Sequence, residues 1–513
     1  METEVTRSEY EVNHMIELSP QVLADYDVIV PDYQPDLLKI LQVDANAAVQ
    51  HFEVQNDRIT ITGKVDYKIL YIPDSATGIT SIITSAPFNH IEENASAKQG
   101  MLCSVLSDVE HVEFSMINSR KIGIKTVVGL DINLVENQKI STITDIAGDD
   151  VELKKRTFRT SRRVIDRTCD ISIADTLAVP VGQPTIQSLI KSDVTIRGKD
   201  VKVISNKVVT KGELVVCTLY SAENESMPVC TCHEVPFTEI LDADGISETQ
   251  NTHVSFLVQS ADFKAAADVD GDLRNIVMDV KLGIQISSDE VTEAEAVYDA
   301  YSTQNDLKLT TSCVELQEMN DYVSGESTVK AAISIPSDFP PLTQVYNVVA
   351  KPYINTAAIQ GGRVVIDGSI DTYVLYISER EDNLLSNYKE EVPFHMELDC
   401  SGGEPGCSVK ALCDVTHVSY NITTSGEVET RIIVGADANV FKTSNVDIVT
   451  DVEALPLESM DDSSIVLYYV QKNDSLWEIA KRYHTKISKV QDVNHLEEDA
   501  VLSSGMQLLI PKS

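Results

Sequence analysis

The segment "ITITGKVDYKILY", from Ile59 to Tyr71, decides the fold of this chain. Its odd positions carry isoleucine, glycine, valine or tyrosine, whereas its even positions from Thr60 to Lys68 carry threonine, lysine or aspartate. Alternation with a period of two is typical of a strand with one buried and one solvated face. A glycine inside so long a strand weakens it unless a bulge or a close backbone contact requires it. The segment therefore predicts a β-strand with a special position at Gly63.

This segment has two counterparts in the chain, "GELVVCTLY" from Gly212 and "GSIDTYVLY" from Gly368. In each copy a pair of prolines comes first, then a glycine, then a tyrosine eight residues after the glycine, and then a Pro-Phe pair, at nearly constant spacing. The repeated residues are Pro31, Pro35, Gly63, Tyr71, Pro87 and Phe88; then Pro180, Pro184, Gly212, Tyr220, Pro236 and Phe237; then Pro336, Pro340, Gly368, Tyr376, Pro393 and Phe394. Such agreement indicates a tandem triplicate. The shared tyrosine and phenylalanine are most simply core residues.

The triplicate predicts a mainly β, multidomain chain, with three tandem antiparallel repeats that resemble a sandwich or a barrel. Each unit has the size of one domain. The predicted boundaries are 1–148 for the first repeat with its N-terminal lead, 149–303 for the second and 304–450 for the third. A linker is expected at 451–464, because the stretch "ALPLESMDDSS" is rich in proline, serine and acidic residues. A small domain of two strands and two helices is expected at 465–513.

The charge of the chain excludes several classes of partner. The 80 acidic and 41 basic residues give a formal net charge of −39. Such a field repels nucleic acid and anionic lipid headgroups. The N-terminal stretch lacks the basic start and apolar run of a signal peptide, and no segment reaches the roughly 18 apolar residues of a membrane span. We therefore expect a protein made and retained in the cytosol, without nucleic-acid partners and without membrane insertion.

The sequence contains no Gly-rich phosphate loop, His-Glu-x-x-His, Gly-x-Ser-x-Gly or Cys-x-x-Cys motif. The nearest metal-like cluster is "CTCH", with Cys230, Cys232 and His233. We interpret it as a strand with alternating cysteines and a surface histidine, because the other two repeats lack an equivalent. A site for a soft metal is the alternative. We predict no catalytic residue, no metal and no cofactor.

The nine cysteines are spread over a long chain, unlike a dense disulfide framework. Three of them, Cys400, Cys407 and Cys413, lie close together in the third repeat. We expect reduced thiols there, and a cross-link in an oxidising setting is the alternative.

The last 50 residues differ from the repeats in charge and in pattern. From Ser464 to Ser513 six basic and six acidic residues balance, so the excess charge belongs to the rest of the chain. The pattern predicts a strand, "IVLYYVQK", then two helices, then a strand, "GMQLLIP". Asp474 or Ser475 is the expected cap of the first helix, and Thr485 that of the second. The second helix is expected to bury Ile487, Val490 and Val493.

This stretch resembles a LysM domain over its whole length. The residues that carry the resemblance are Tyr469-Val470, the "NDSLWEIA" run from Asn473 to Ala480, Asn494 with Leu496, and "GMQLLIP" from Gly505 to Pro511. Asn473 stands where the family usually has glycine, and asparagine tolerates a left-handed turn. LysM domains bind N-acetylglucosamine polymers in a shallow groove between two loops. The resemblance places this groove at Asn473, Asp474, Ser475 and Leu476, and at Asn494, His495, Leu496 and Glu497.

Two questions remain open for these residues. Asp474, Ser475 and Asn494 either bind a ligand or only cap helices and turns. Trp477, the single tryptophan of the chain, either packs half-buried against the first strand of the module or stands exposed as an anchor for a glycan or a protein partner.

Three Pro…Gly…Tyr…Pro-Phe units followed by one LysM-like module resemble the SipL (SpoIVA-interacting protein L) family, whose repeats are SPOCS domains. The resemblance covers nearly the whole chain and rests on the architecture more than on one motif. It implies a non-enzymatic scaffold of the spore coat, made in the mother-cell cytoplasm and recruited to the forespore surface. The implied partners are the SpoIVA-type ATPase that polymerises there, contacted through the LysM module, and other spore coat proteins. The alternative is a cell-wall or cortex tether that binds peptidoglycan or N-acetylglucosamine oligomers.

Overall fold

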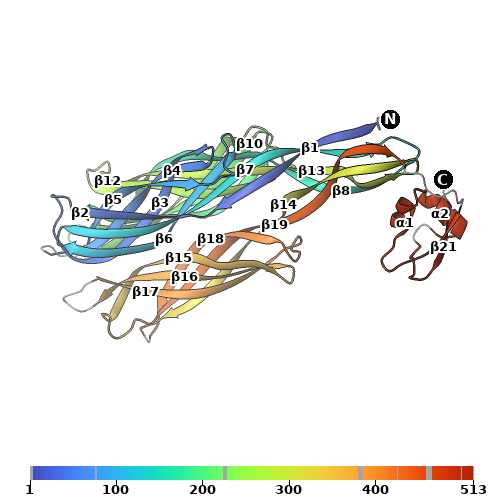
Figure 1. Ribbon diagram of the computed structural model, residues 1–513. Coiled ribbons are helices and arrows are strands. Elements are labelled where there is room, and N and C mark those ends of the chain that lie inside the picture. The colour runs from blue at the N-terminus through green and yellow to red at the C-terminus, as the bar shows by residue number, and fades with distance from the viewer. Residues whose placement is uncertain are drawn as a thin grey trace.

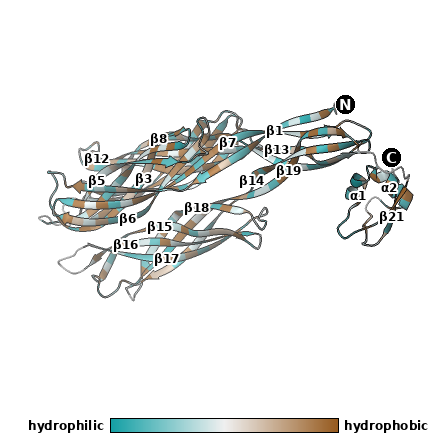
Figure 2. Ribbon diagram, viewed as in Figure 1, coloured by the Kyte–Doolittle hydropathy of each residue, from teal (hydrophilic) through white to brown (hydrophobic). Residues whose placement is uncertain are grey.

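The computed structural model describes residues 4–74, 78–222, 228–378, 385–424, 426–457, 465–497 and 500–511. Most of this chain is antiparallel β-strand, and two short helices lie near the C-terminus (Figure 1). Apolar and polar residues alternate along many of the strands (Figure 2). The predicted mainly β, antiparallel fold is confirmed. No helix in the described chain is long and apolar enough to cross a membrane.

Each repeat is a sandwich of two sheets that face each other across an apolar core. In the first repeat, one sheet contains β1 (Val5–Leu18), β7 (Lys121–Ile146), β2 (Gln21–Ile29) and β6 (Leu102–Asn118), and the other contains β3 (Leu37–Gln55), β4 (Arg58–Pro73) and β5 (Thr80–Glu93). In the second repeat, the sheets are β12 (Asn251–Ala267), β13 (Leu273–Ser302) and β8 (Val151–Ala178), and β11 (Val229–Asp242), β10 (Lys207–Ala222) and β9 (Ile186–Ile204). In the third, they are β14 (Asn305–Ile333), β19 (Val428–Pro456) and β18 (Ser408–Ile422), and β15 (Leu342–Gln360), β16 (Arg363–Ser378) and β17 (Leu385–Asp399).

The end of β19 corrects one expectation. This strand continues to Pro456, so the first residues of the expected linker at 451–464 belong to the third repeat. They pair with the start of β14. Residues 458–464 lie outside the described chain.

The repeated glycine of each sandwich lies beneath the repeated phenylalanine. The two residues face each other in register as Gly63 with Phe88, Gly212 with Phe237, and Gly368 with Phe394. A Cβ atom at Gly368 would lie 2.5 Å from Cε1 of Phe394 and would also meet the carbonyl oxygen of Tyr353. The close backbone contact expected from the sequence is therefore the packing of an aromatic ring on bare backbone.

The repeated tyrosine ties the proline loop to the core of each sandwich. Its hydroxyl donates a hydrogen bond to the carbonyl of the second proline: Tyr71 to Pro35 at 2.9 Å, Tyr220 to Pro184 at 3.1 Å and Tyr376 to Pro340 at 2.9 Å. All three rings are fully buried. They are core residues, as expected, and they also satisfy a loop carbonyl.

The three sandwiches pack around one pseudo-threefold axis. Leu41, Ile190 and Tyr346 lie equally far beyond the first proline of their repeats, and Leu70, Leu219 and Leu375 directly precede the repeated tyrosines. All six belong to a single apolar cluster. Because equivalent residues of all three repeats meet there, the repeats surround an axis instead of following one another like beads (Figure 1).

The longest strands leave the sandwiches and form a second feature, which we call the stalk. Past their pairing with β6, β12 and β18, the strands β7, β13 and β19 continue as two-stranded ribbons with the first long strand of their own repeat. The ribbons are 5–14 with 136–146, 151–162 with 290–302, and 305–318 with 442–456. All three contribute to two shared apolar clusters. The stalk therefore continues the same axis away from the sandwiches (Figure 1).

The C-terminal module has the predicted order, with β20 (Ile465–Tyr469), α1 (Leu476–Arg482), α2 (Ile487–Asn494) and β21 (Gln507–Pro511). Two details differ from the expectation. The N-cap of α2 is Lys486 and not Thr485, which is fully buried. Val493, expected inside, is 41% exposed.

Candidate binding module at the end of the stalk

The two loops predicted to line a glycan groove both contribute to the core of the module. Leu476, from the loop after β20, and Leu496, from the loop after α2, pack against the same buried cluster. Asn473 and His495 adopt left-handed backbone conformations, with φ of 72° and 52°. Asn473 therefore adopts the left-handed conformation that favours glycine, as expected for asparagine at this position.

The polar side chains of the first loop are bound within the module. The hydroxyl of Ser475 accepts a hydrogen bond from the backbone N–H of Glu478 at 3.2 Å and caps α1. Asp474 Oδ2 accepts from the hydroxyl of Tyr468 at 2.6 Å and from the backbone N–H of Gln471 at 2.8 Å. These hydrogen bonds hold the pKa of Asp474 below its usual value. Ser475 therefore caps α1, and Asp474 holds the turn after β20.

Asn494 is likewise engaged. Its amide nitrogen donates to the carbonyl of Leu509 at 2.6 Å, and its oxygen accepts from the backbone N–H of Leu509 at 2.7 Å. The side chain thus extends the pairing of β21 and fixes α2 beside it. Among the remaining groove residues, Asn473, His495 and Glu497 are exposed.

The sheet of the module carries an exposed apolar face, which we call the outer face. It consists of Ile465, Leu467, Tyr469 and Leu509, which are 55%, 52%, 49% and 41% exposed. Leu467 faces Leu509 in register, so the four side chains share one side of the sheet. The alternate residues, Leu508 and Ile510 among them, are buried in the core of the module. A clustered apolar surface of this kind is typical of an interaction site.

Trp477 lies neither against the first strand of the module nor at the surface. It is 5% exposed and packs edge-on against Tyr301 of β13, with ring centroids 4.9 Å apart. Its indole N–H donates to Asp299 Oδ2 at 2.6 Å, and the ammonium of Lys154 lies 4.8 Å from the ring centroid. Both alternatives considered from the sequence are therefore wrong, because the indole is covered by the second repeat.

Further contacts hold the module to the same ribbon. Lys481 Nζ donates to Asp299 Oδ1 at 2.5 Å, and the hydroxyl of Tyr301 donates to the carbonyl of Thr485 at 2.9 Å. His484 Nδ1 lies 2.9 Å from the carbonyl oxygen of Ser302. Sequence reasoning missed this attachment, since its partners lie far apart in the chain.

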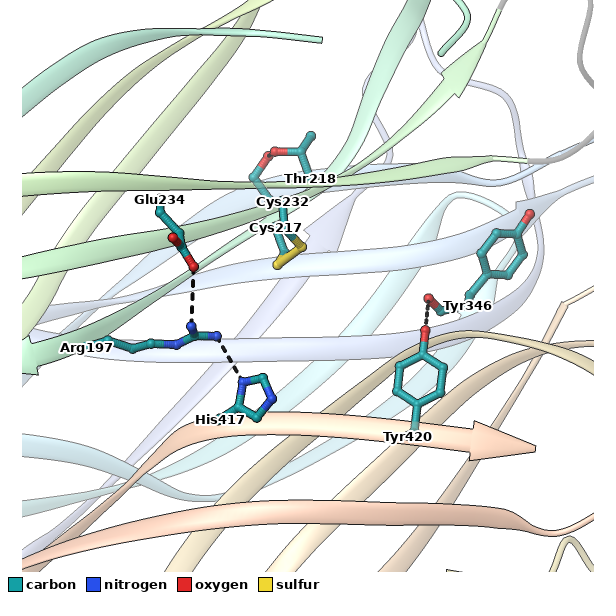
Figure 3. The surroundings of a disulfide bond; sticks show 9 residues. Arg197, Cys217, Thr218, Cys232, Glu234, Tyr346, His417 and Tyr420 are labelled. Atoms are coloured by element: carbon teal, nitrogen blue, oxygen red, sulfur yellow. Dashed lines mark hydrogen bonds and ion pairs between the residues drawn. A yellow bond between two sulfur atoms is a disulfide. The ribbon is translucent and has the colours of Figure 1, made fainter. Parts of the chain in front are cut away.

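The structure contains a disulfide bond that was not predicted from the sequence. Cys217 of β10 and Cys232 of β11 face each other and form a disulfide (Figure 3). Beside it, Arg197 lies between Glu234 of its own repeat and His417 of the third repeat, at 3.5 Å and 3.2 Å. Cys230 is a free thiol, as are Cys400, Cys407 and Cys413.

The disulfide bears on the metal alternative for "CTCH". Cys232 is bonded to Cys217 and is not available as a thiolate ligand. His233 Nε2 lies 2.9 Å from the carbonyl oxygen of Ala178. The described residues hold no group of three or more histidine, cysteine, aspartate or glutamate side chains that is suited to a metal ion.

Comparison with known families agrees with the architecture. Residues 36–117, 185–266 and 341–423 match the model of the SipL SPOCS domain, and residues 468–511 match that of the LysM domain. Each SPOCS match covers four consecutive strands, β3 to β6, β9 to β12 and β15 to β18, and leaves the long strands of the stalk outside. Neither a curated protein nor a solved structure matches the chain.

Both kinds of domain are non-catalytic, and LysM domains are associated with peptidoglycan binding. Three SPOCS domains and one LysM domain, in this order and over these residues, identify the chain as a member of the SipL family of sporulation proteins.

Proposed function

We propose that this chain is a non-enzymatic scaffold of the spore coat that docks on a SpoIVA-type coat ATPase through its LysM domain. Docking would recruit it from the mother-cell cytoplasm to the forespore surface. The observation that carries the proposal is the outer face of the LysM domain, where Ile465, Leu467, Tyr469 and Leu509 are exposed side by side. Exposed clusters of large apolar side chains are suited to a protein partner and supply most of the binding energy of an interface.

The state of the predicted glycan groove supports a protein ligand over a sugar. Recognition of N-acetyl groups and sugar hydroxyls requires polar groups that are free to bond. Ser475, Asp474 and Asn494 already bond to the backbone of the module or to Tyr468. Replacing these internal hydrogen bonds by bonds to a sugar would disturb a helix cap and the edge of β21.

The acidic repeats would then form the part of the scaffold that is turned toward other coat proteins. The formal charge of −39 belongs to the chain outside the LysM domain. Such a charge favours basic partners and suppresses contact with nucleic acid. The stalk separates this acidic body from the LysM domain (Figure 1).

The test compares two glutamate substitutions in the full chain. Leu467→Glu places a charge in the centre of the outer face, and we expect it to weaken binding to the coat ATPase at least about tenfold, as the loss of a hot-spot residue does. Ile83→Glu is the matched control, because Ile83 is an exposed isoleucine of β5 in the first repeat. Calorimetry with the purified ATPase gives the affinities, and circular dichroism confirms that both variants fold.

The peptidoglycan alternative is tested by titrating the full chain with N-acetylglucosamine oligomers in the same calorimeter. Trp477 fluorescence is a poor reporter for this titration, since the indole is buried against Tyr301 and not in the groove. Sugar binding without ATPase binding would contradict the proposal and identify a wall or cortex tether. Equal ATPase binding by Leu467→Glu and the parent chain would exclude the outer face.

A further inference from the structure

Three aspartates occupy the same position in the three ribbons of the stalk. Asp145, Asp299 and Asp451 lie equally far beyond Gly129, Gly283 and Gly435, and each of these glycines lies beneath a bulged residue of the neighbouring strand. Two of the aspartates form ion pairs between repeats.

In the first pair, Asp145 of the first repeat lies 3.2 Å from Lys155 of the second repeat. In the second pair, Asp451 of the third repeat lies 2.7 Å from Arg7 of the first. Each carboxylate therefore meets a cation from the next repeat around the axis.

The equivalent ion pair between the second and third repeats does not form. Arg7, Lys155 and Thr311 are equivalent, because they face Ile143, Val297 and Val449, which occupy one position in their ribbons. Thr311 carries no charge, so the third repeat offers Asp299 no cation at this position. Asp299 accepts instead from Lys481 at 2.5 Å and from the indole of Trp477 at 2.6 Å. The LysM domain thus takes the place that a cation of the third repeat would occupy.

The residues of the second repeat around Asp299 form a close contact with the LysM domain. We call Lys154, Asp299 and Tyr301 the socket. Tyr301 is 2% exposed, and Trp477, between Tyr301 and Lys154, is 5% exposed. A buried aromatic pair combined with charge-assisted hydrogen bonds is the arrangement found at the centre of strong interfaces.

The socket and the outer face lie on opposite sides of the LysM domain. Trp477 and Ala480 of α1 form a cluster with Tyr301, whereas Ile479 of the same helix is buried in the core of the domain. Beyond that core lies the sheet, whose far side is the outer face. The order of layers is therefore stalk, helix, core, sheet, outer face.

We propose that the socket fixes the LysM domain on the stalk so that its outer face points away from the repeats, and that Asp299 and Trp477 are positioning residues for docking. The proposal rests on the proposed function, because it concerns the surface that the partner contacts. A domain held in one orientation binds without the entropic cost of ordering it first. Trp477 then affects docking through the orientation of the domain and does not touch the partner.

The first test restores the missing cation. In Thr311→Lys the new ammonium can pair with Asp299, just as Lys155 pairs with Asp145 and Arg7 with Asp451. It then competes with Lys481 for the carboxylate of Asp299. We expect the LysM domain to leave the socket, with a red-shifted Trp477 emission and several-fold stronger quenching by acrylamide. Since Trp477 is the only tryptophan, the signal comes from this contact alone. Thr310→Lys is the control, because it adds the same charge on the other face of β14.

Asp299→Leu tests the same contact by removal, and circular dichroism establishes that the variants keep their β structure. Unchanged Trp477 emission in both Thr311→Lys and Asp299→Leu would overturn the proposal, since the domain would then be held without Asp299. This readout needs no partner and is independent of the proposed function.

The second test measures affinity for the coat ATPase. We expect Thr311→Lys and Asp299→Leu to weaken binding by about tenfold, a common size for coupling between two sites, although neither residue lies on the LysM domain. If the released domain binds equally well or more tightly, the socket does not position it and the proposal is wrong. Failure of Leu467→Glu to weaken binding would instead refute the docking surface of the proposed function, so the two failures are distinguishable.

Discussion

The second repeat carries charge at two places where the first and third repeats do not. At the base of the stalk, Arg163 is buried between Asp289, at 2.6 Å, and Asp166, at 2.6 Å. The equivalent residues of the other repeats are Met15 and Met319, which face Val135 and Phe441 in register where Arg163 faces Asp289. One position thus holds a buried, ion-paired arginine in the second repeat, whereas the sequence has methionine there in the first and third repeats.

The axis between the sandwiches shows the same contrast. Lys191 is buried and pairs with Asp44 of the first repeat at 2.7 Å and with Asp193 at 3.1 Å. Burial lowers the pKa of its ammonium, but the two carboxylates outweigh this effect and the pKa is raised. Gln42 and Asn347 hold the equivalent positions. Residues present in all repeats therefore build the sandwich. The buried charges unique to the second repeat instead specify which repeats pack against it. Such specificity is the best-attested role of buried polar groups.

The largest effect should come from making the second repeat like the others at the base of the stalk. Arg163→Met leaves Asp289 and Asp166 buried without their cation, and we expect a loss of about 4 kcal/mol in the free energy of unfolding. Urea denaturation followed by circular dichroism measures it. The double variant Arg163→Met with Asp289→Val copies the first repeat more fully and should regain much of the loss. A single variant as stable as the parent would show that the ion pair is not needed to bury these carboxylates.

A substitution at a shared position should cost somewhat less but should affect the whole chain. In Gly368→Val the new side chain meets Phe394 and the carbonyl oxygen of Tyr353, and overpacking of this kind costs about 3 kcal/mol. Because the three repeats share one axis, Trp477 fluorescence and circular dichroism should report one common transition. Gly123→Ala is the control, since its Cβ would meet only the ends of side chains, the nearest at 3.3 Å. Separate transitions would mean that the repeats unfold one by one.

The disulfide of the second repeat should matter less than either change. Lys68 with Ile83 and Tyr373 with Lys389 occupy the places of Cys217 and Cys232 in the other repeats. We expect Cys217→Ser to cost about 2 kcal/mol, near the lower end for a native disulfide, because the two strands are already paired. A reductant should lower the melting temperature of the parent chain and leave that of the variant unchanged.

Two free thiols with raised pKa values, Cys103 and Cys413, provide an internal reference in that experiment. Burial raises the pKa of Cys103 and of Cys413 to about 12, so neither thiol should react with iodoacetamide in the folded chain at pH 8. Mass spectrometry should find Cys217 and Cys232 alkylated only after reduction. Alkylation of these two cysteines without a reductant would contradict the bond.

The comparison also explains what the sequence could and could not predict. Period-two alternation and the repeated Pro, Gly, Tyr and Phe residues are local patterns. They predicted the strands, three antiparallel repeats built as a sandwich or a barrel, and the order of elements in the LysM domain. The residues on the outward face of a strand show no comparable pattern from which the neighbouring repeat or domain could be identified. The disulfide, the pseudo-threefold axis and the position of Trp477 depend on such faces, so they could not be predicted.

One signal for the socket was nevertheless present in the sequence. An alignment of the late strands places Asp145, Asp299 and Asp451 at one position, in "TDI", "YDA" and "TDV". The matching positions Arg7, Lys155 and Thr311 then show one missing cation. A comparison of the charges at aligned positions of the three repeats would have shown that Asp299 lacks the cation that Asp145 and Asp451 have.

The smallest effect should come from the tyrosine that all three repeats share. Tyr71→Phe removes the hydrogen bond to the carbonyl of Pro35 and should cost about 1 kcal/mol at pH 8. Burial raises the pKa of Tyr71 from 10.0 to about 12. Between pH 10 and 12 the unfolded chain loses this proton while the folded chain keeps it, so stability falls as the pH rises.

The Tyr71→Phe variant has no phenol to ionise at this position. The difference in free energy of unfolding between it and the parent chain should therefore shrink between pH 10 and 12. Urea titrations of both proteins at pH 8, 10 and 11 measure the difference. Tyr220 and Tyr376 also have raised pKa values through burial, and the corresponding variants should behave alike if the repeats are equivalent at this position. A constant difference across the pH range would mean that Tyr71 ionises as readily in the folded chain as in the unfolded one, and the shared tyrosine would then be a packing residue alone.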